Sequence, residues 1–207
     1  MIKSVIGLLT VILTLGVAMA FGQMKPVGEK AAPKTASAAA GPVKVTPLTL
    51  PEGYNAGEVT GNLKDGAKLS SLRWAERSSV ACFPGTRFEM FNGNTLFYRI
   101  TLPAASKIKI TVTPTGDRAI NLYALRQGIK AQDQTVPPDV SSAISCEASY
   151  PIYANLGGGR RVANKDDGTR KVEYISVGSP YSILIGVAGA EGLTEGEFKL
   201  GIEITSR

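Results

Sequence analysis

Histidine is missing from all 207 residues of the sequence. It is the commonest general base, the commonest neutral metal ligand and the centre of Ser-His and Cys-His nucleophilic systems. Its absence excludes those chemistries. No two carboxylates can be placed face to face from the sequence, and no serine lies in a nucleophile-elbow pattern. We therefore predict that the protein is not an enzyme, with a hydrolase based on carboxylates kept as an alternative.

Cysteine is almost as scarce, with two residues, Cys82 and Cys146. Two cysteines without histidine cannot complete a zinc shell. In an oxidising compartment they would pair, and closing a loop of that length removes about 4 kcal/mol of unfolded-state entropy in the simple chain model. The sequence therefore predicts a disulfide, with two separately buried thiols as the alternative.

The chain has few charged residues and a net positive charge, with 23 basic against 17 acidic residues. The positive charges are scattered along the chain, so they do not indicate a nucleic-acid partner. The densest basic pair, Arg160-Arg161, follows three glycines at 157–159. This segment lacks the Lys-Ser/Thr of a phosphate-binding loop. We interpret it as a surface loop, with a patch for an anionic glycan or another anion as the alternative.

Long apolar runs are absent except at the N-terminus. Residues 4–24 carry no charge, they follow Lys3, and Ala18-Met19-Ala20 offers the small residues that a signal peptidase reads. We predict a signal peptide over residues 1–20. The alternative is an uncleaved anchor, because about 20 apolar residues span a bilayer. Both predict a secreted, periplasmic or cell-surface protein that meets the membrane only through this segment.

Residues 21–60 are poor in large apolar side chains and rich in Ala, Pro and Lys. Such a segment cannot bury enough surface to offset its ordering entropy. Prolines at several positions also prevent a continuous helix. We predict a flexible, disordered linker here, followed by one domain over residues 61–207.

Within that domain the hydrophobic pattern has a period of two. Apolar and polar residues alternate in the ranges 96–102, 107–113 and 197–205, and further strands are expected over 119–125, 170–177 and 181–188. A short strand is expected around Cys146, a long loop over 127–142, and a helical turn within 68–77. No segment after residue 60 shows a helical stripe. These features predict an all-β fold, an antiparallel two-sheet β-sandwich of jelly-roll type.

The order of these strands resembles the bacterial pre-peptidase C-terminal domain family over residues 92–205. The resemblance is carried by residues 96–102, 107–113, 116–123, 173–175, 181–187 and 196–200. It implies a small sandwich with an accessory or binding role, since no peptidase precedes it in this chain. It also implies calcium binding as a hypothesis, since some members of the family bind calcium. The family's paired aspartates fall here on Ala119 and Asn121, and its Ala-Gly before the penultimate strand is Ser179-Pro180.

Oxygen-bearing side chains near turns are the candidates for such a cation. They are Asp117, Asn121, Asp166 and Asp167, the last two just before Gly168. Calcium prefers carboxylate and amide oxygens. Asp side chains that bond the local backbone of a turn account for the same residues. We prefer that interpretation, so no cofactor is predicted and calcium is kept as a hypothesis.

Aromatic residues gather around the two cysteines. They are Trp74, Phe83, Phe88, Phe91, Tyr150 and Tyr153. They fit a hydrophobic core around a disulfide, and a platform for stacking carbohydrate is the alternative.

The sequence as a whole predicts an exported, non-catalytic β-sandwich that binds a glycan or a protein of the cell envelope. The alternative is a structural subunit of a surface layer or extracellular filament. Such a subunit would self-assemble through exposed edge strands or through the linker.

Overall fold

The computed structural model describes residues 43–52, 55–77, 79–83, 85–151, 155–156, 160–161 and 167–207. The predicted signal peptide, and the predicted linker as far as residue 42, lie outside these residues. None of the helices in the described ranges has the length and apolar composition needed to cross a membrane.

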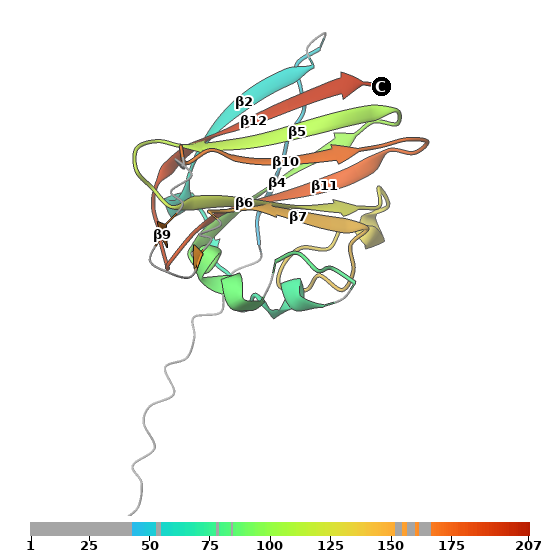
Figure 1. The fold of residues 1–207 in the computed structure, drawn as a ribbon. Coiled ribbons are helices and arrows are strands. Elements are labelled where there is room, and N and C mark those ends of the chain that lie inside the picture. The colour runs from blue at the N-terminus through green and yellow to red at the C-terminus, as the bar shows by residue number, and fades with distance from the viewer. Residues whose placement is uncertain are drawn as a thin grey trace, which may run out of the picture. The chain divides into compact units, whose positions relative to one another are not determined.

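Two β-sheets form the body of this part of the chain (Figure 1). The six-stranded sheet has the order β1 (Val45–Pro47), β4 (Asn94–Leu102), β11 (Tyr181–Gly189), β6 (Ile120–Gln127) and β7 (Ser145–Ser149), with β3 (Ala67–Lys68) also paired to β4. The four-stranded sheet has the order β10 (Arg170–Ile175), β5 (Ser106–Pro114), β12 (Glu197–Ser206) and β2 (Ala56–Asn62). A separate hairpin pairs β8 (Asn155–Leu156) with β9 (Arg160–Arg161). The predicted two-sheet sandwich is confirmed.

The sandwich begins before the predicted domain boundary at residue 61. β2 pairs with β12 from Asn62 to Ala56, and β1 lies beside β4, parallel to it, with Val45 opposite Phe97. All other strand pairs are antiparallel. Composition misled the prediction, because β2 carries only one large apolar side chain, Val59. Its place in the sheet comes from backbone pairing.

The main core lies between the two sheets and follows the predicted alternation. On β5, Ile108, Ile110 and Val112 are buried, while the residues between them are less buried or exposed. Matching inward side chains come from the other long strands, namely Tyr98, Ile100, Leu102, Ile120, Leu122, Val172, Tyr174, Ile183, Ile185, Val187, Phe198, Leu200 and Ile202. Period-two burial therefore builds this aliphatic core.

A second hydrophobic cluster covers the outer face of the six-stranded sheet. It is formed by the chain around the short 3₁₀ turns η2 (Arg73–Glu76) and η3 (Gly85–Met90). These turns lie below β6 and β7 in Figure 1, on the side away from the four-stranded sheet. Two further 3₁₀ turns are η1 (Leu63–Asp65) and η4 (Ala131–Asp133). The predicted helical turn within residues 68–77 is η2, and the predicted loop 127–142 holds η4.

Candidate functional site

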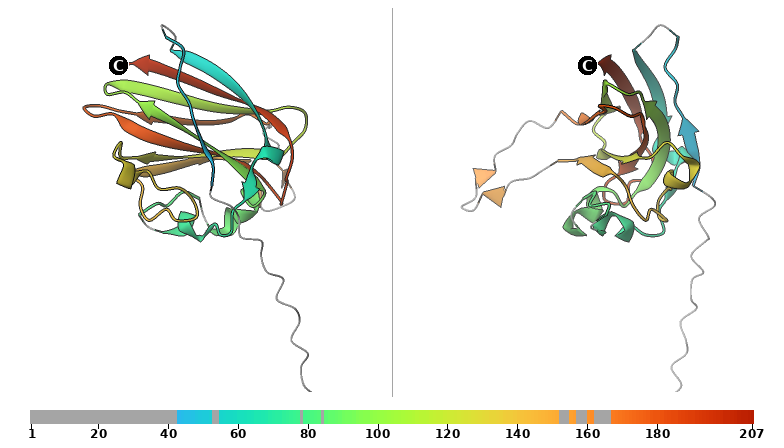
Figure 2. Two further views of the ribbon diagram at one scale, coloured as in Figure 1. Left: turned by 180° about the vertical axis from the view of Figure 1, so that it is seen from behind. Right: turned by 90° about the vertical axis from the view of Figure 1, so that its right-hand side faces the viewer.

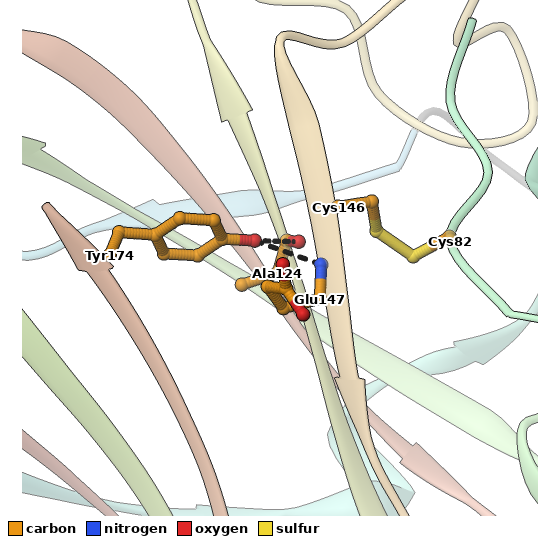
Figure 3. Close-up of a disulfide and its surroundings, with 5 residues drawn as sticks. All are labelled: Cys82, Ala124, Cys146, Glu147 and Tyr174. Carbon is orange, nitrogen blue, oxygen red and sulfur yellow. Dashed lines mark hydrogen bonds between the residues drawn. A yellow bond between two sulfur atoms is a disulfide. The ribbon is translucent and has the colours of Figure 1, made fainter.

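The predicted disulfide between Cys82 and Cys146 is present (Figure 3). It joins the segment before η3 to β7, an edge strand of the six-stranded sheet. Cys82 belongs to the cluster on the outer face of this sheet, and Cys146 packs against it. The covalent link thus fastens a non-periodic stretch of chain to the sheet that it covers.

Tyr174 closes the side of the sandwich where β10 approaches β7 (Figure 3). Its hydroxyl donates to the carbonyl of Ala124 and accepts from the backbone N–H of Glu147 at 3.0 Å. Burial raises the pKa of this hydroxyl well above its usual value. The role of Tyr174 is structural, since both of its partners are backbone groups of the other sheet.

The aromatic residues around the disulfide form part of the core. Trp74, Phe83 and Phe91 are buried, and each lies within 6 Å of the Tyr123 ring centroid. Phe88 and Tyr150 pack against the same cluster, whereas Tyr153 lies outside the described residues. Side chains buried in this way cannot stack on a carbohydrate. The core interpretation is confirmed for the described members of the set.

Tyr123 sits at the centre of this aromatic layer, opposite Gly186 of β11. A β-carbon on Gly186 would come within 2.3 Å of the Tyr123 ring, so the ring occupies the space that a side chain would need. The Tyr123 hydroxyl is buried and has no hydrogen-bond partner among the described residues. Burial alone raises its pKa far above the usual range.

The residues proposed for calcium lie in different environments. Asp117 is exposed in the turn between β5 and β6. Asn121 is fully buried, its Nδ2 donates to the Met90 carbonyl at 2.8 Å, and its Oδ1 accepts from Nε of Arg170 at 2.9 Å. The amide of Asn121 is therefore already engaged in the fold.

Asp167 behaves as a turn residue, because its carboxylate accepts from the N–H of Thr169 at 2.9 Å. Asp166 lies outside the described residues. Within the described ranges, no three acidic or cysteine side chains come together as a metal-binding group. Calcium binding stays a prediction.

Arg160 and Arg161 form β9, with Leu156 and Asn155 of β8 as their partners. The hairpin lies away from the sandwich in the right-hand view of Figure 2. The positions of these two side chains are outside the described part of the structure. Anion binding by this pair stays a prediction.

The outer face of the four-stranded sheet carries charged side chains in pairs. Lys107 contacts Glu173 at 3.2 Å, and Lys199 contacts Glu58 at 3.2 Å. Lys107 lowers the pKa of the Glu173 carboxyl through a hydrogen bond. All four side chains are exposed, so these pairs contribute little to stability. They mark this face as a solvated one.

Large exposed aliphatic side chains gather at one end of the sandwich, which we call the aliphatic end. It is the end where β6 finishes, β7 begins, and the chain crosses from β10 to β11 (Figure 1). Among the described residues the large hydrophobic side chains classed as exposed are Ile129, Ile144, Ile175 and Val177, with 52%, 49%, 45% and 71% of their surface exposed. The turns at the opposite end hold Asp117, Glu191 and Glu195 instead.

This surface was not predicted from the sequence, although the sequence contains a signal for it. In β10 the even positions Val172 and Tyr174 point inward, so Ile175 and Val177 fall on the outward parity. An aliphatic residue at an outward position breaks the alternation. Apolar side chains at these outward positions are not needed to build the core, so they indicate a surface with another role.

Two arginines of the six-stranded sheet lie near the aliphatic end, on opposite faces of that sheet. Arg99 faces the outer cluster, and its guanidinium donates to Gln134 Oε1, Gln127 Oε1 and the Gln134 carbonyl at 3.1, 3.4 and 3.3 Å. Desolvation lowers its pKa. These contacts tie Arg99 to the loop after β6, which makes it a structural residue.

Arg126 is held differently. Its Nη1 donates to the Ile175 carbonyl at 3.2 Å, and its guanidinium carbon lies 4.7 Å from the ring centroid of Tyr181. Its backbone carbonyl accepts from the N–H of Ile144 at 2.8 Å. Among the described residues, its buried Nε has no hydrogen-bond partner, and no carboxylate forms an ion pair with its guanidinium. Arg126 is thus linked to three residues of the aliphatic end.

Comparison with known proteins adds solved structures only, since no family model and no curated protein matches the chain. The periplasmic inhibitor of g-type lysozyme from Aeromonas hydrophila matches at 13% identity and a TM-score of 0.41, over 79% of this chain and 97% of that one. The pre-peptidase C-terminal domain of Bacillus anthracis collagenase matches at 11% identity and a TM-score of 0.35, over 79% and 97%. The surface-associated copper-binding protein CorA of Methylomicrobium album matches at 8% identity and 0.40, over 80% and 98%.

At these identities the likeness concerns the fold alone. A pre-peptidase C-terminal domain is thus among the solved structures to which the chain is similar.

Proposed function

We propose that the protein is an exported, non-catalytic binding module of the cell envelope and that it binds a protein partner through the aliphatic end. The observation that carries this proposal is the position of the exposed large hydrophobic side chains. All four that the described residues contain lie at one end of the sandwich. Soluble proteins rarely gather exposed aliphatics unless the patch meets a partner.

Export is supported by two independent features. The N-terminal residues carry the pattern of a signal peptide, and the domain contains a disulfide. Disulfides persist in oxidising compartments and are rare in the cytosol. The proposal therefore places the folded domain outside the cytoplasm, in the periplasm or at the cell surface.

The choice of the aliphatic end over the other surfaces follows from their chemistry. The outer face of the four-stranded sheet carries solvent-exposed ion pairs such as Lys107–Glu173 and Lys199–Glu58. The outer face of the six-stranded sheet is already covered by the aromatic layer. Loops at the end of a sandwich are also where this architecture commonly places its binding residues.

Photo-crosslinking in the producing cell tests the proposal. The photoreactive residue p-benzoylphenylalanine is placed at Val177, and at Thr113 as a control. Thr113 is an exposed β5 residue towards the opposite end of the sandwich. We expect one protein adduct from position 177 and none from 113. The adduct partner is then purified and titrated with the wild type and with Val177→Asp, which should bind at least about tenfold more weakly because a charge would be buried.

Three outcomes would contradict the proposal: equal adducts from both positions, an adduct that contains only glycan, and equal binding by Val177→Asp. An adduct consisting of two copies of the chain would favour the surface-layer or filament alternative. Light scattering of the purified protein over a wide concentration range would then have to show assembly.

A further inference from the structure

Ile175, Tyr181 and Ile144 all contact Arg126 at the aliphatic end. The Ile175 carbonyl and the Tyr181 ring hold its guanidinium, and the Ile144 N–H bonds its backbone. Tyr181 is partly buried against the main core, so the ring that supports the guanidinium is itself fixed. A guanidinium positioned in this way loses little conformational freedom when a ligand binds.

Most of the hydrogen-bonding capacity of Arg126 is unused. A guanidinium carries five N–H donors. Among the described residues its side chain makes a single hydrogen bond, from Nη1 to Ile175 at an exposed position, and the buried Nε makes none. The two Nη2 donors and the second Nη1 donor make no hydrogen bond within the described residues.

The charge of Arg126 is uncompensated as well. Glu147 acts electrostatically on the Tyr174 hydroxyl together with Arg126, but no ion pair between these two residues occurs in the described ranges. Arg99, the other arginine of the six-stranded sheet near this end, has three oxygen acceptors from Gln127 and Gln134. Of these two arginines, Arg99 has its guanidinium bonded to three oxygens, whereas the guanidinium of Arg126 is bonded to one.

We infer that Arg126 is the receptor for a carboxylate of the protein partner, presented beside apolar side chains that cover Ile175 and Val177. This inference rests on the proposed function and adds the chemistry that the partner must have. The guanidinium and carboxylate match in charge and in planar geometry, so two parallel hydrogen bonds can form. Aliphatic neighbours would exclude water from the pair, as the rim of an interface does around an arginine anchor.

A membrane surface is the competing occupant, because aliphatic side chains beside an arginine also suit anionic lipids. A protein is favoured because the border of the patch carries charges of both signs. Glu147 is exposed on β7, and on β10 Glu173 pairs with Lys107 at 3.2 Å and with Lys171 at 3.6 Å. Surfaces that bind anionic bilayers have a polar rim rich in Lys and Arg, whereas mixed charges suit a protein surface with a matching pattern.

Small probes test the carboxylate directly. Hexanoate, hexan-1-ol and hexylammonium share one alkyl chain and differ in the head group, and each is titrated into the isotope-labelled, full exported chain followed by NMR. We expect saturable hexanoate shifts at the Arg126 side chain and at the backbone of Ile144, Ile175 and Val177. Hexan-1-ol should bind about tenfold more weakly, the typical effect of losing a hydrogen bond between charged groups, and hexylammonium more weakly still.

Variants separate the role of the charge from that of the fold. Arg126→Gln should lower hexanoate affinity to the level of hexan-1-ol, while Arg118→Gln, an exposed arginine in the turn between β5 and β6, should leave it unchanged. Arg126→Lys keeps the charge and should retain part of the preference. Thermal unfolding of each variant shows whether the fold is intact, and Tyr181→Phe, which keeps the ring, should bind hexanoate as the wild type does.

Equal binding of hexanoate and hexan-1-ol would overturn the inference while leaving an apolar protein-binding end intact. Hexanoate shifts that survive Arg126→Gln would also overturn it. Sedimentation of the wild type, but not of Val177→Asp, with vesicles of phosphatidylglycerol and phosphatidylethanolamine would overturn it in favour of a membrane surface. A carboxylate preference lost in Arg126→Gln and kept in Arg118→Gln would support it.

Discussion

The two faces of the six-stranded sheet bury equally apolar surfaces by different means. The inner face packs against a second sheet, and its aliphatic residues repeat at every second position, as Ile183, Ile185 and Val187 do on β11. The outer face packs against 3₁₀ turns and loops, and five of the 14 buried residues in its cluster are aromatic. A second β-sheet packs against a face on which apolar residues repeat at every second position. Turns and loops leave gaps of uneven shape, which large aromatic rings fill, and a disulfide holds such a segment in place.

The four-stranded sheet provides the contrast. It is buried on one face only, and β5, β10 and β12 alternate between core residues and polar or charged residues such as Lys109 and Glu203. β6 and β11, in the middle of the other sheet, are buried along almost their whole length. Burial on both faces thus erases the period-two pattern in the strands that matter most for the core.

Of the changes that test the difference between the two faces, removal of the disulfide should lower the free energy of unfolding most. The bond closes a loop of 64 residues in the sequence. We expect the double variant Cys82→Ser, Cys146→Ser to lose about 4 kcal/mol of unfolding free energy. Hydrogen exchange should rise first in the segment from Trp74 to Phe91 and least in β5. Uniform loss of protection in both sheets would show that the aromatic layer is not a separate unit.

Adding one methyl group should distinguish the covered sheet face from the open one. Gly186→Ala brings a β-carbon within 2.3 Å of the Tyr123 ring and should cost about 3 kcal/mol, at the upper end for overpacking. Gly201→Ala on β12 meets nothing closer than 4.0 Å, and the stiffer residue should stabilise the strand by about 0.5 kcal/mol. Chemical denaturation measures both. Similar costs at the two positions would contradict the assignment of one covered and one open face.

Alkaline pH should act on buried tyrosines in both regions. Burial raises the pKa of Tyr123 in the aromatic layer and of Tyr174 beside the main core. Unfolded tyrosine ionises near pH 10, so the stability from this source is complete below pH 10. Above it the unfolded state releases protons that the folded state keeps, and the free energy of unfolding falls by up to about 1.4 kcal/mol per pH unit for each tyrosine.

Tyrosinate absorbance and fluorescence, recorded together during an alkaline titration, measure this effect. The two hydroxyls should ionise only when the protein unfolds. Ionisation of all tyrosines near pH 10 in a protein that stays folded would contradict the burial of these groups.

Removing single hydroxyl groups should give the smallest effects and opposite signs in the two regions. The Tyr123 hydroxyl has no partner among the described residues, so Tyr123→Phe should raise the free energy of unfolding by about 1 kcal/mol. The Tyr174 hydroxyl bonds Ala124 and Glu147, so Tyr174→Phe should lower it by about 2 kcal/mol. Denaturation midpoints compare the two directly, and a loss at both positions would indicate that Tyr123 is also bonded.

The sequence predicted the strands correctly where the local hydrophobic pattern and the burial in the fold have the same origin. The ends of β5, β10 and β12 were predicted to within two residues, because each strand has one face exposed to solvent and one buried in the core. The disulfide was predicted from the count of cysteines and the expected compartment. β1 and β2 were assigned to the linker, because their small and polar side chains carry no pattern and their strand state depends on pairing with β4 and β12.

The candidate site shows the same division. Arg126 and Tyr181 are 55 positions apart in the numbering of the chain, and nothing local connects them. Their contact exists because β6 and β11 pair in one register, which brings Ile183 opposite Arg126. The outward aliphatic residues Ile175 and Val177 could have been noticed from the sequence, since they interrupt the alternation of β10.

The sequence by itself determined the class of fold, the disulfide partners and the apolar N-terminal segment, because periodicity, cysteine count and local composition act over a few residues each. Only the tertiary structure decided that one sheet is covered on both faces, that Asn121 is bonded inside the fold, and that Arg126 keeps free donors among exposed aliphatics. These depend on contacts between distant strands, and such contacts are set by strand order and register rather than by any local pattern.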